Sequence, residues 1–356
     1  MNTKDEILQA LAGQPAAVPP AAVFTQSATM DLMDRTGCSW PAAHTDPAQM
    51  AGLALGISRF CGMHSARVPF CVSAEAERLG CTVRMGKHNA APAVTGSPYR
   101  RGEGFAEVPD LMSPSEFTAA GRTRTAVEAV DRLHREHGED LAVIAGVTGP
   151  LTVTTHLLGA EAMLIAMVAA PDRVLAWQRA LQPLMAAYVR ELADAGADVI
   201  QLSEGSGSPD LISPDDFDRF AGNYLRGLTR VPGAYTSLHI CGEVAPIIRK
   251  MTATGVDAVS LDCHVEPREA VHLVGGRAAL IGNVGPVRSL MTGTPEDVQR
   301  DARDCAEAGF SIIAPGCGVP ISAPTANLRA LAAYARPQRP SVKKKAAGGP
   351  AADVFS

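Results

Sequence analysis

The sequence predicts an α/β protein built as a (β/α)8 barrel, the TIM-barrel architecture, with an irregular helical extension at its N-terminus. From Leu141 onward, short apolar or β-branched runs alternate with longer amphipathic segments, and this alternation is typical of a parallel sheet. An open doubly wound sheet would be expected to have a G-x-G-x-x-G turn after its first strand, and no predicted strand is followed by one. The closed barrel is therefore the favoured architecture.

The N-terminal extension is predicted to contain two helices, over Lys4–Leu11 and Pro47–Cys61, the second with Asp46 as its N-cap. The chain then divides into three regions: residues 1–65 as the extension packed on the barrel, residues 66–336 as the barrel, and residues 337–356 as a disordered basic tail.

The barrel strands are read from the apolar runs, and six are visible from Leu141 onward: Leu141–Val147, Asp198–Leu202, Ala234–Leu238, Ala258–Leu261, Ala279–Ile281 and Phe310–Ile313. The first of these strands is followed by a helical stretch that breaks near Pro171. The later strands are followed by predicted helices over Asp215–Arg230, Val244–Thr252, Pro267–Val274, Pro295–Ala308 and Ala326–Tyr334. One or two further strands are possible at Val68–Phe70 and Gly104–Val108, which would bring the total to eight.

The composition is that of a globular protein, since 46% of the 356 residues are hydrophobic and 19% are charged. The net charge is −5, but the end of the chain from Arg336 carries +4 and leaves −9 on the rest. An acidic body gives no electrostatic reason to bind nucleic acid. The longest apolar run, Ala162–Ala170, is nine residues long, which is too short to cross a bilayer. We therefore expect neither a nucleic acid nor a membrane as partner.

The first residues lack the basic and then apolar profile of a secretion signal. We therefore expect a cytoplasmic protein whose eight cysteines are free thiols. Most of these cysteines lie in apolar or helical contexts and are interpreted as packing residues, namely Cys38, Cys61, Cys71, Cys81 and Cys305.

The chemistry-bearing residues follow the predicted strands, where the reactive groups of (β/α)8 barrels lie. His239 and Cys241 are two residues apart at a strand end and share a face if the strand continues through Ile240. Cys317 lies between two glycines after the last strand. One imidazole and two thiolates suit tetrahedral zinc and leave its fourth position open, which is typical of a catalytic site. The alternative is that these cysteines simply pack in the core.

Two acidic residues also follow predicted strands, Glu204 and Asp262. Asp262 begins an Asp-x-His sequence of the kind found in corrinoid-binding domains, but a proline, Pro267, stands where such domains have a glycine. We therefore expect any corrinoid to be carried by a separate protein. Cys263 and His264 are close to the same rim and are alternatives for a supporting role.

The His239-x-Cys241 pair with the distant Gly-Cys317-Gly resembles the zinc-dependent methylcobamide:coenzyme M methyltransferases of the uroporphyrinogen decarboxylase superfamily. The resemblance covers about residues 4–336 and includes further segments at Val68–Cys81, Thr148–Thr152, Leu211–Phe217, Ile281–Pro286, Gly293–Glu296 and Ser322–Asn327. It implies a (β/α)8 barrel that binds zinc through these three residues. It also implies transfer of a methyl group from methylcobalamin on a partner corrinoid protein to a small thiol such as coenzyme M, or to another acceptor such as tetrahydrofolate.

Within this resemblance, Glu204 is a candidate catalytic residue, as a displaceable fourth ligand or as the base that takes the thiol proton. A structural hydrogen bond to a neighbouring loop is the alternative. Asp262 is expected to orient His239 through its second ring nitrogen. The chain departs from the decarboxylases in having no arginine in Ala21–Thr29, where they clamp a porphyrinogen's carboxylates. A decarboxylase of a smaller acid, and a non-catalytic zinc or corrinoid-protein binding module, remain the alternative functions.

Overall fold

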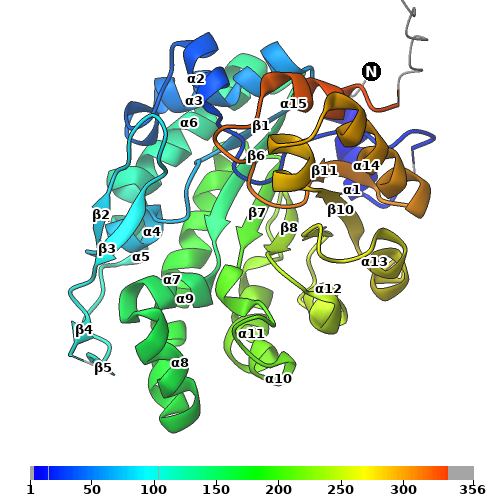
Figure 1. Ribbon diagram of the computed structural model, residues 1–356. Coiled ribbons are helices and arrows are strands. Elements are labelled where there is room, and N and C mark those ends of the chain that lie inside the picture. The colour runs from blue at the N-terminus through cyan, green and yellow to red at the C-terminus, as the bar shows by residue number, and fades with distance from the viewer. Residues whose placement is uncertain (1–3, 15, 103, 336–356) are drawn as a thin grey trace, which may run out of the picture.

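The computed structural model describes residues 4–14, 16–102 and 104–335, and its centre is a curled sheet of parallel strands wrapped by helices (Figure 1). The predicted basic tail, residues 337–356, lies outside the described residues. The strand order is β1-β6-β7-β8-β9-β10-β11, and every neighbouring pair is parallel. The strands are β1 (Ser65–Val68), β6 (Ala142–Thr148), β7 (Val199–Ser203), β8 (Tyr235–Ile240), β9 (Ala258–Leu261), β10 (Ala279–Val284) and β11 (Ile312–Pro315).

The gap between the two edge strands, β11 and β1, is occupied by an extended segment near the N-terminus. Ala21 forms a parallel bridge with Ile313, and the Ala22 amide donates to the Ile313 carbonyl at 3.0 Å. On the other side, the Val23 amide donates to the Ser65 hydroxyl at 3.1 Å. The predicted barrel of parallel strands is thus confirmed, and residues well before the regular strand–helix alternation take its eighth position.

The two possible extra strands have different outcomes. The one predicted at Val68–Phe70 is present three residues earlier, as β1. The one predicted at Gly104–Val108 is wrong as a barrel strand, because Gly104–Phe105 (β5) pairs antiparallel with Arg100–Arg101 (β4) in a separate hairpin. The Phe105 ring lies under the Arg173 guanidinium, with 4.5 Å between the guanidinium carbon and the ring centre. The hairpin therefore packs on the helix that contains Arg173. A second hairpin pairs β2 (Thr82–Arg84) with β3 (Ala93–Gly96).

The apolar core has two parts. Inside the barrel, Ile7 and Leu11 of α1 (Lys4–Leu11) pack with inward side chains such as Ile144 and Ile281 and close the end where the strands begin. The larger part lies between the outer face of the sheet and the helices. Alternate residues of each strand belong to one part or the other, as the period of two of a β-strand requires. The opposite end of the barrel, where the strands finish, is left for polar side chains.

The helices around the sheet follow the prediction closely where the caps are clear. Asp46 caps α3 as predicted, since its carboxylate accepts from the Ala48 and Gln49 amides, and the helices at Pro267–Val274 and Pro295–Ala308 have the predicted bounds. The α-helices after α1 are α2 (Met30–Thr36), α3 (Pro47–Ala54), α4 (Ala74–Arg78), α5 (Pro114–Ala119), α6 (Gly121–His137), α7 (Pro150–Leu158), α8 (Ala160–Ala169), α9 (Pro171–Asp194), α10 (Pro214–Asp216), α11 (Asn223–Leu225), α12 (Ile248–Thr252), α13 (Pro267–Val274), α14 (Pro295–Ala308) and α15 (Thr325–Ala332).

Short 3-10 and π segments replace parts of three of the predicted helices, and the one predicted over Val244–Thr252 begins as a 3-10 segment before α12. The helix predicted over Pro47–Cys61 changes after α3 into a π turn, and the one predicted over Asp215–Arg230 is a chain of short α, π and 3-10 pieces. These segments are η1 (Ala42–His44), η2 (Ile57–Cys61), η3 (Gly205–Gly207), η4 (Phe217–Gly222), η5 (Arg226–Leu228), η6 (Ala245–Ile247) and η7 (Pro286–Met291).

Among the described residues, no single helix is long and apolar enough to cross a membrane. Only α7 and α8 taken together reach the required length and apolarity, and the two are bent by 108° at Gly159.

Candidate metal centre at the strand ends

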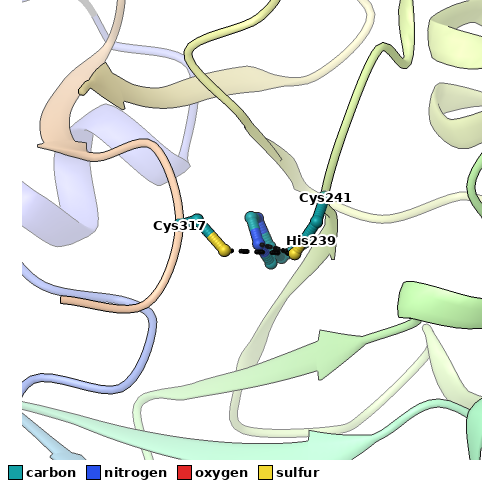
Figure 2. A group of neighbouring side chains, drawn as sticks. All are labelled: His239, Cys241 and Cys317. Atoms are coloured by element: carbon teal, nitrogen blue, oxygen red, sulfur yellow. Dashed lines mark hydrogen bonds between the residues drawn. The ribbon is translucent and has the colours of Figure 1, made fainter. Parts of the chain in front are cut away.

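His239, Cys241 and Cys317 meet at the end of the barrel where the strands finish. The His239 Nε2 lies 3.2 Å from the Cys241 Sγ, and the Cys241 Sγ lies 3.1 Å from the Cys317 Sγ. Figure 2 shows the cysteine after β11 pointing across the barrel mouth to the two residues at the end of β8. The structure therefore brings together the three side chains that the sequence analysis named as metal ligands.

Two glycines let the backbone turn beside the two sulfurs. Gly242 has a φ of +90°, and a Cβ there would lie 2.0 Å from the Asp210 carboxylate. A Cβ on Gly316 would lie 2.8 Å from the backbone nitrogen of Cys263. A larger residue at either position would displace the turn that carries a cysteine.

The two thiols form a close, half-buried pair. The hydrogen bond from Cys241 lowers the pKa of the Cys317 thiol, and the same bond together with burial raises the pKa of the Cys241 thiol. The contact thus favours ionisation of the Cys317 thiol over that of the Cys241 thiol. Thiolate is the form of cysteine that binds metals.

The His239 ring is oriented by Ser260 on the adjacent strand β9. Its Nδ1 lies 3.2 Å from both the carbonyl oxygen and the hydroxyl of Ser260, which directs Nε2 toward the sulfurs. The expectation that Asp262 would orient this ring is wrong, because Ser260 is the residue paired with His239 in the sheet register and Asp262 lies two residues farther along. The alternation of strand side chains could have identified Ser260, had the register been known.

Asp262 is buried beside His239, Cys241 and Cys317, called the metal-binding group below for the role proposed for it, and holds the turn that follows Cys241. Its Oδ2 accepts from the Gly242 amide at 3.0 Å, and its Oδ1 lies 3.0 Å from the His264 Nδ1. With Cys263 these side chains form a second cluster of possible ligands, in which both Cys263 and His264 are exposed.

Glu204 is fully buried, and its carboxylate is turned toward α7. One oxygen accepts from the Leu151 amide at 2.9 Å, and the other accepts from the Thr152 amide at 2.8 Å and from the Thr152 hydroxyl at 2.5 Å. Gly149 makes room for this contact, since a Cβ there would lie 2.4 Å from the carboxylate. Burial raises the pKa of Glu204 to about 7, although the three hydrogen bonds act in the opposite direction.

Glu75 is a second buried carboxylate at this rim that the sequence analysis did not name as a site residue. It accepts from the Thr148 amide at 2.8 Å and from the Thr148 hydroxyl at 2.7 Å. This contact links α4 to the end of β6 and fixes the segment that follows β1.

The three-residue group fits a zinc ion by its chemistry. Its donors are one imidazole nitrogen and two sulfurs, all within 4.8 Å of one another, and this borderline-soft set is one that zinc prefers. Within the residues that the structure describes, no other histidine, cysteine, aspartate or glutamate joins these three. A three-ligand set of this kind is typical of a zinc site that keeps a position for substrate.

The fold and the site together define a (β/α)8 barrel protein with a soft set of possible metal ligands at the end of the barrel where its strands finish. The chain belongs to the uroporphyrinogen decarboxylase (URO-D) family, whose model matches residues 2–337.

Relatives within this family differ in how much of the chain they match. The "Methylcobamide:CoM methyltransferase MtaA" of Methanosarcina barkeri is 32% identical, over 93% of this chain and 96% of its own length. A uroporphyrinogen decarboxylase of a Synechococcus species is 31% identical, but over only 50% of this chain and 52% of its own. A solved structure, a methyltransferase from Methanosarcina mazei, superposes with a TM-score of 0.88 at 32% identity and covers 93% of this chain and 97% of its own.

Proposed function

We propose that this protein is an enzyme that transfers a methyl group from a methylated corrinoid to a thiol, with zinc held by His239, Cys241 and Cys317. The carrying observation is the meeting of one imidazole and two thiols at the barrel mouth. The full-length match to a methylcobamide:CoM methyltransferase supports the same function, and the matched decarboxylases share only half the chain.

The reaction requires a thiolate, because the sulfur attacks the methyl carbon. The sulfur–carbon bond forms while the carbon–cobalt bond breaks, and the electron pair of that bond stays on cobalt. A free thiol with a pKa of about 8.5 is only about 3% ionised at pH 7. Zinc, when bound, would supply full ionisation of the acceptor thiol. That alone would increase the rate by up to roughly 30-fold, or about 2 kcal/mol.

The protein's own side chains set the charge and the orientation of the site. Two thiolates and a neutral imidazole cancel the charge of a divalent ion, so the acceptor sulfur keeps its negative charge and its nucleophilicity. Ser260 fixes the His239 ring, and Asp262 holds the turn after Cys241. We assign Glu204 the structural role of capping α7, because both of its oxygens are occupied by that helix.

The methyl donor is proposed to be a methylcobamide on a separate protein, and the acceptor a small thiol such as coenzyme M. The chain lacks the glycine that an Asp-x-His corrinoid motif requires after His264, so it has no corrinoid motif of its own. The names of the relatives favour coenzyme M as acceptor.

The test is transfer from free methylcobalamin to coenzyme M, followed by the change in corrinoid absorbance. We expect the methylcobalamin spectrum to be lost with zinc-loaded protein, to persist after the metal is removed by chelation, and to be lost again when zinc is restored. Full activity in metal-free protein would contradict the role of zinc. Release of carbon dioxide from a porphyrinogen, without methyl transfer, would restore the decarboxylase alternative.

A further inference from the structure

The segment Leu79–Gly102, called the basic arm below, differs in charge from the rest of the chain. It contains Arg84, Lys87, Arg100 and Arg101 and no acidic residue, although the net charge of the whole chain is −5. All four cationic side chains are exposed. The basic arm is thus a local concentration of positive charge on an acidic protein.

These four cations have no ion-pair partner among the described residues. Some exposed arginines elsewhere have one, as in the pairs Arg35–Asp31, Arg124–Glu128, Arg135–Asp131 and Arg300–Asp297, whereas others, such as Arg190 and Arg230, also have none among the described residues. Arg100 and Arg101 donate only to backbone carbonyls. The positive charge of the basic arm is therefore available to an outside partner.

The basic arm lies against the helices that follow β6 at the catalytic end of the barrel. The Ser97 hydroxyl donates to the Leu157 carbonyl of α7, and an added Cβ at Gly159 would lie 3.2 Å from the Arg100 Nε. In Figure 1 the β4–β5 hairpin and α8 lie at the lower left, and the β2–β3 hairpin lies above them on the left side, with its tip toward α2, where the His88 Nε2 lies 2.9 Å from the Asp34 Oδ1. A partner that spans this side of the molecule can therefore meet both the basic arm and the surface of α8.

Apolar side chains are exposed on the same side of the molecule. Ile165 and Val168 of α8 are 59% and 87% exposed. In the part of the chain that the structure describes, six large hydrophobic residues are exposed, and five of them lie in segments that follow barrel strands: Val72, Ile165, Val168, Leu211 and Val287. An apolar helix beside unpaired cations is the composition of a protein interface with a charged rim.

We propose that the basic arm and α8 form the docking surface for the protein that carries the methylcobamide, which contacts them with an acidic patch and a small apolar patch. This inference rests on the proposed function, because the donor must be brought to the barrel mouth by its carrier. The cations steer the encounter, and Ile165 and Val168 are covered in the complex.

A protein carrier fits these features better than a nucleic acid or a lipid surface. Binding of nucleic acid is built on many phosphate contacts and on a strongly basic face, whereas the basic arm offers four cations on an acidic body. The rest of this acidic protein would be repelled by a phosphate backbone or an anionic bilayer. It would not be repelled by a partner protein whose acidic patch contacts the basic arm alone.

The experiment compares two methyl donors in the same assay, free methylcobalamin and a corrinoid-binding protein of the same organism loaded with methylcobalamin. The test variant is R84E/K87E/R100E/R101E. A matched control, R190E/R230E, reverses exposed cations near the opposite end of the barrel. We expect the test variant to raise the KM for the protein donor at least roughly tenfold and to weaken its dependence on salt. The rate with free methylcobalamin should change less than about twofold.

A second variant, I165S/V168S, tests the apolar part without changing charge, and it should also affect only the protein donor. An unchanged KM for the protein donor in both test variants would overturn the proposal. So would an equal loss with both donors, or loss of binding to anionic vesicles or RNA without loss of carrier kinetics. Failure of wild-type protein with free methylcobalamin would instead contradict the proposed function, so the two failures are distinguishable.

Discussion

Two polar groups at the same rim of the barrel, one buried and one half-buried, differ in what their polar atoms contact. The Glu204 carboxylate accepts three hydrogen bonds from α7, so both of its oxygens have partners within the protein. The imidazole and thiols of His239, Cys241 and Cys317 instead contact one another, at 3.1–3.2 Å. A buried carboxylate whose oxygens are satisfied by the protein is structural, whereas an imidazole and two thiols that face one another are a donor set suited to a metal ion.

Substitutions in these two groups should therefore have different effects. Removing a ligand from the metal-binding group should affect metal content and reaction. Changing Glu204 should affect the stability of the fold and its dependence on pH, because the partners of this buried side chain belong to the first turn of a helix.

The largest effect is expected from Cys317→Ala. Zinc in structural sites is bound with about 10–16 kcal/mol, so the loss of one of the three protein ligands should lower affinity on the order of 1,000-fold and abolish methyl transfer. The measurement is zinc per protein after gel filtration, with affinity taken from competition with a chromophoric chelator.

The matched control is Cys305→Ala, which removes a buried thiol that contacts Asn283 rather than the metal-binding group. It should keep one zinc and lose only stability, by about 1–2 kcal/mol. Zinc binding that is undiminished in Cys317→Ala would break the comparison, because the group would then not be the metal site.

The second effect concerns the stability of the fold and its dependence on pH at Glu204. Its pKa is raised from 4.5 to about 7, so the native state binds a proton that the unfolded chain releases. Protonated Glu204 therefore contributes to the free energy of unfolding at low pH. This contribution is lost as the pH rises from about 4.5 through 7. The loss reaches about 3 kcal/mol when the whole shift is counted at 1.36 kcal/mol per pH unit.

The measurement is urea unfolding of wild type and Glu204→Gln at several pH values, because the variant cannot titrate here and all other groups cancel in the difference. The free energy of unfolding of wild type, relative to Glu204→Gln, should fall by up to about 3 kcal/mol between pH 4.5 and 8. A constant difference would show that Glu204 titrates alike in both states. Zinc content should stay at one equivalent, and its loss would place Glu204 with the metal ligands.

The sequence predicted what depends on local pattern. The strand–helix alternation predicted the barrel. The positions of His239, Cys241 and Cys317 after strands predicted that they share one rim, because parallel strands all finish at the same end. The helix at Pro295–Ala308 is predictable from its caps, with Thr294 before it and Gly309 after it.

What the sequence did not reveal depends on contacts between distant segments. The eighth position of the barrel is occupied by residues near Ala21, whose pairing with Ile313 leaves no local periodicity. The partner of His239 is Ser260 rather than Asp262, because strand register decides which of two inward residues lies opposite the ring. The direction of the Glu204 side chain likewise depends on Gly149 in another loop.

The smallest effect is expected from Ser260→Ala, which sharpens the comparison by testing how the metal-binding group is held. The variant removes the hydroxyl near the His239 Nδ1 but keeps the backbone carbonyl at 3.2 Å. Residues that orient a metal-bound histidine typically contribute 10–100-fold to affinity, and with one of two acceptors retained we expect a loss of roughly three- to tenfold. Zinc competition at pH 7 measures it. The control is Ser237→Ala on β8. The buried hydroxyl of Ser237 has no hydrogen-bond partner, so this variant should leave the zinc affinity unchanged. An equal loss in both variants would mean that the hydroxyl acts through packing and that the carbonyl alone orients the ring.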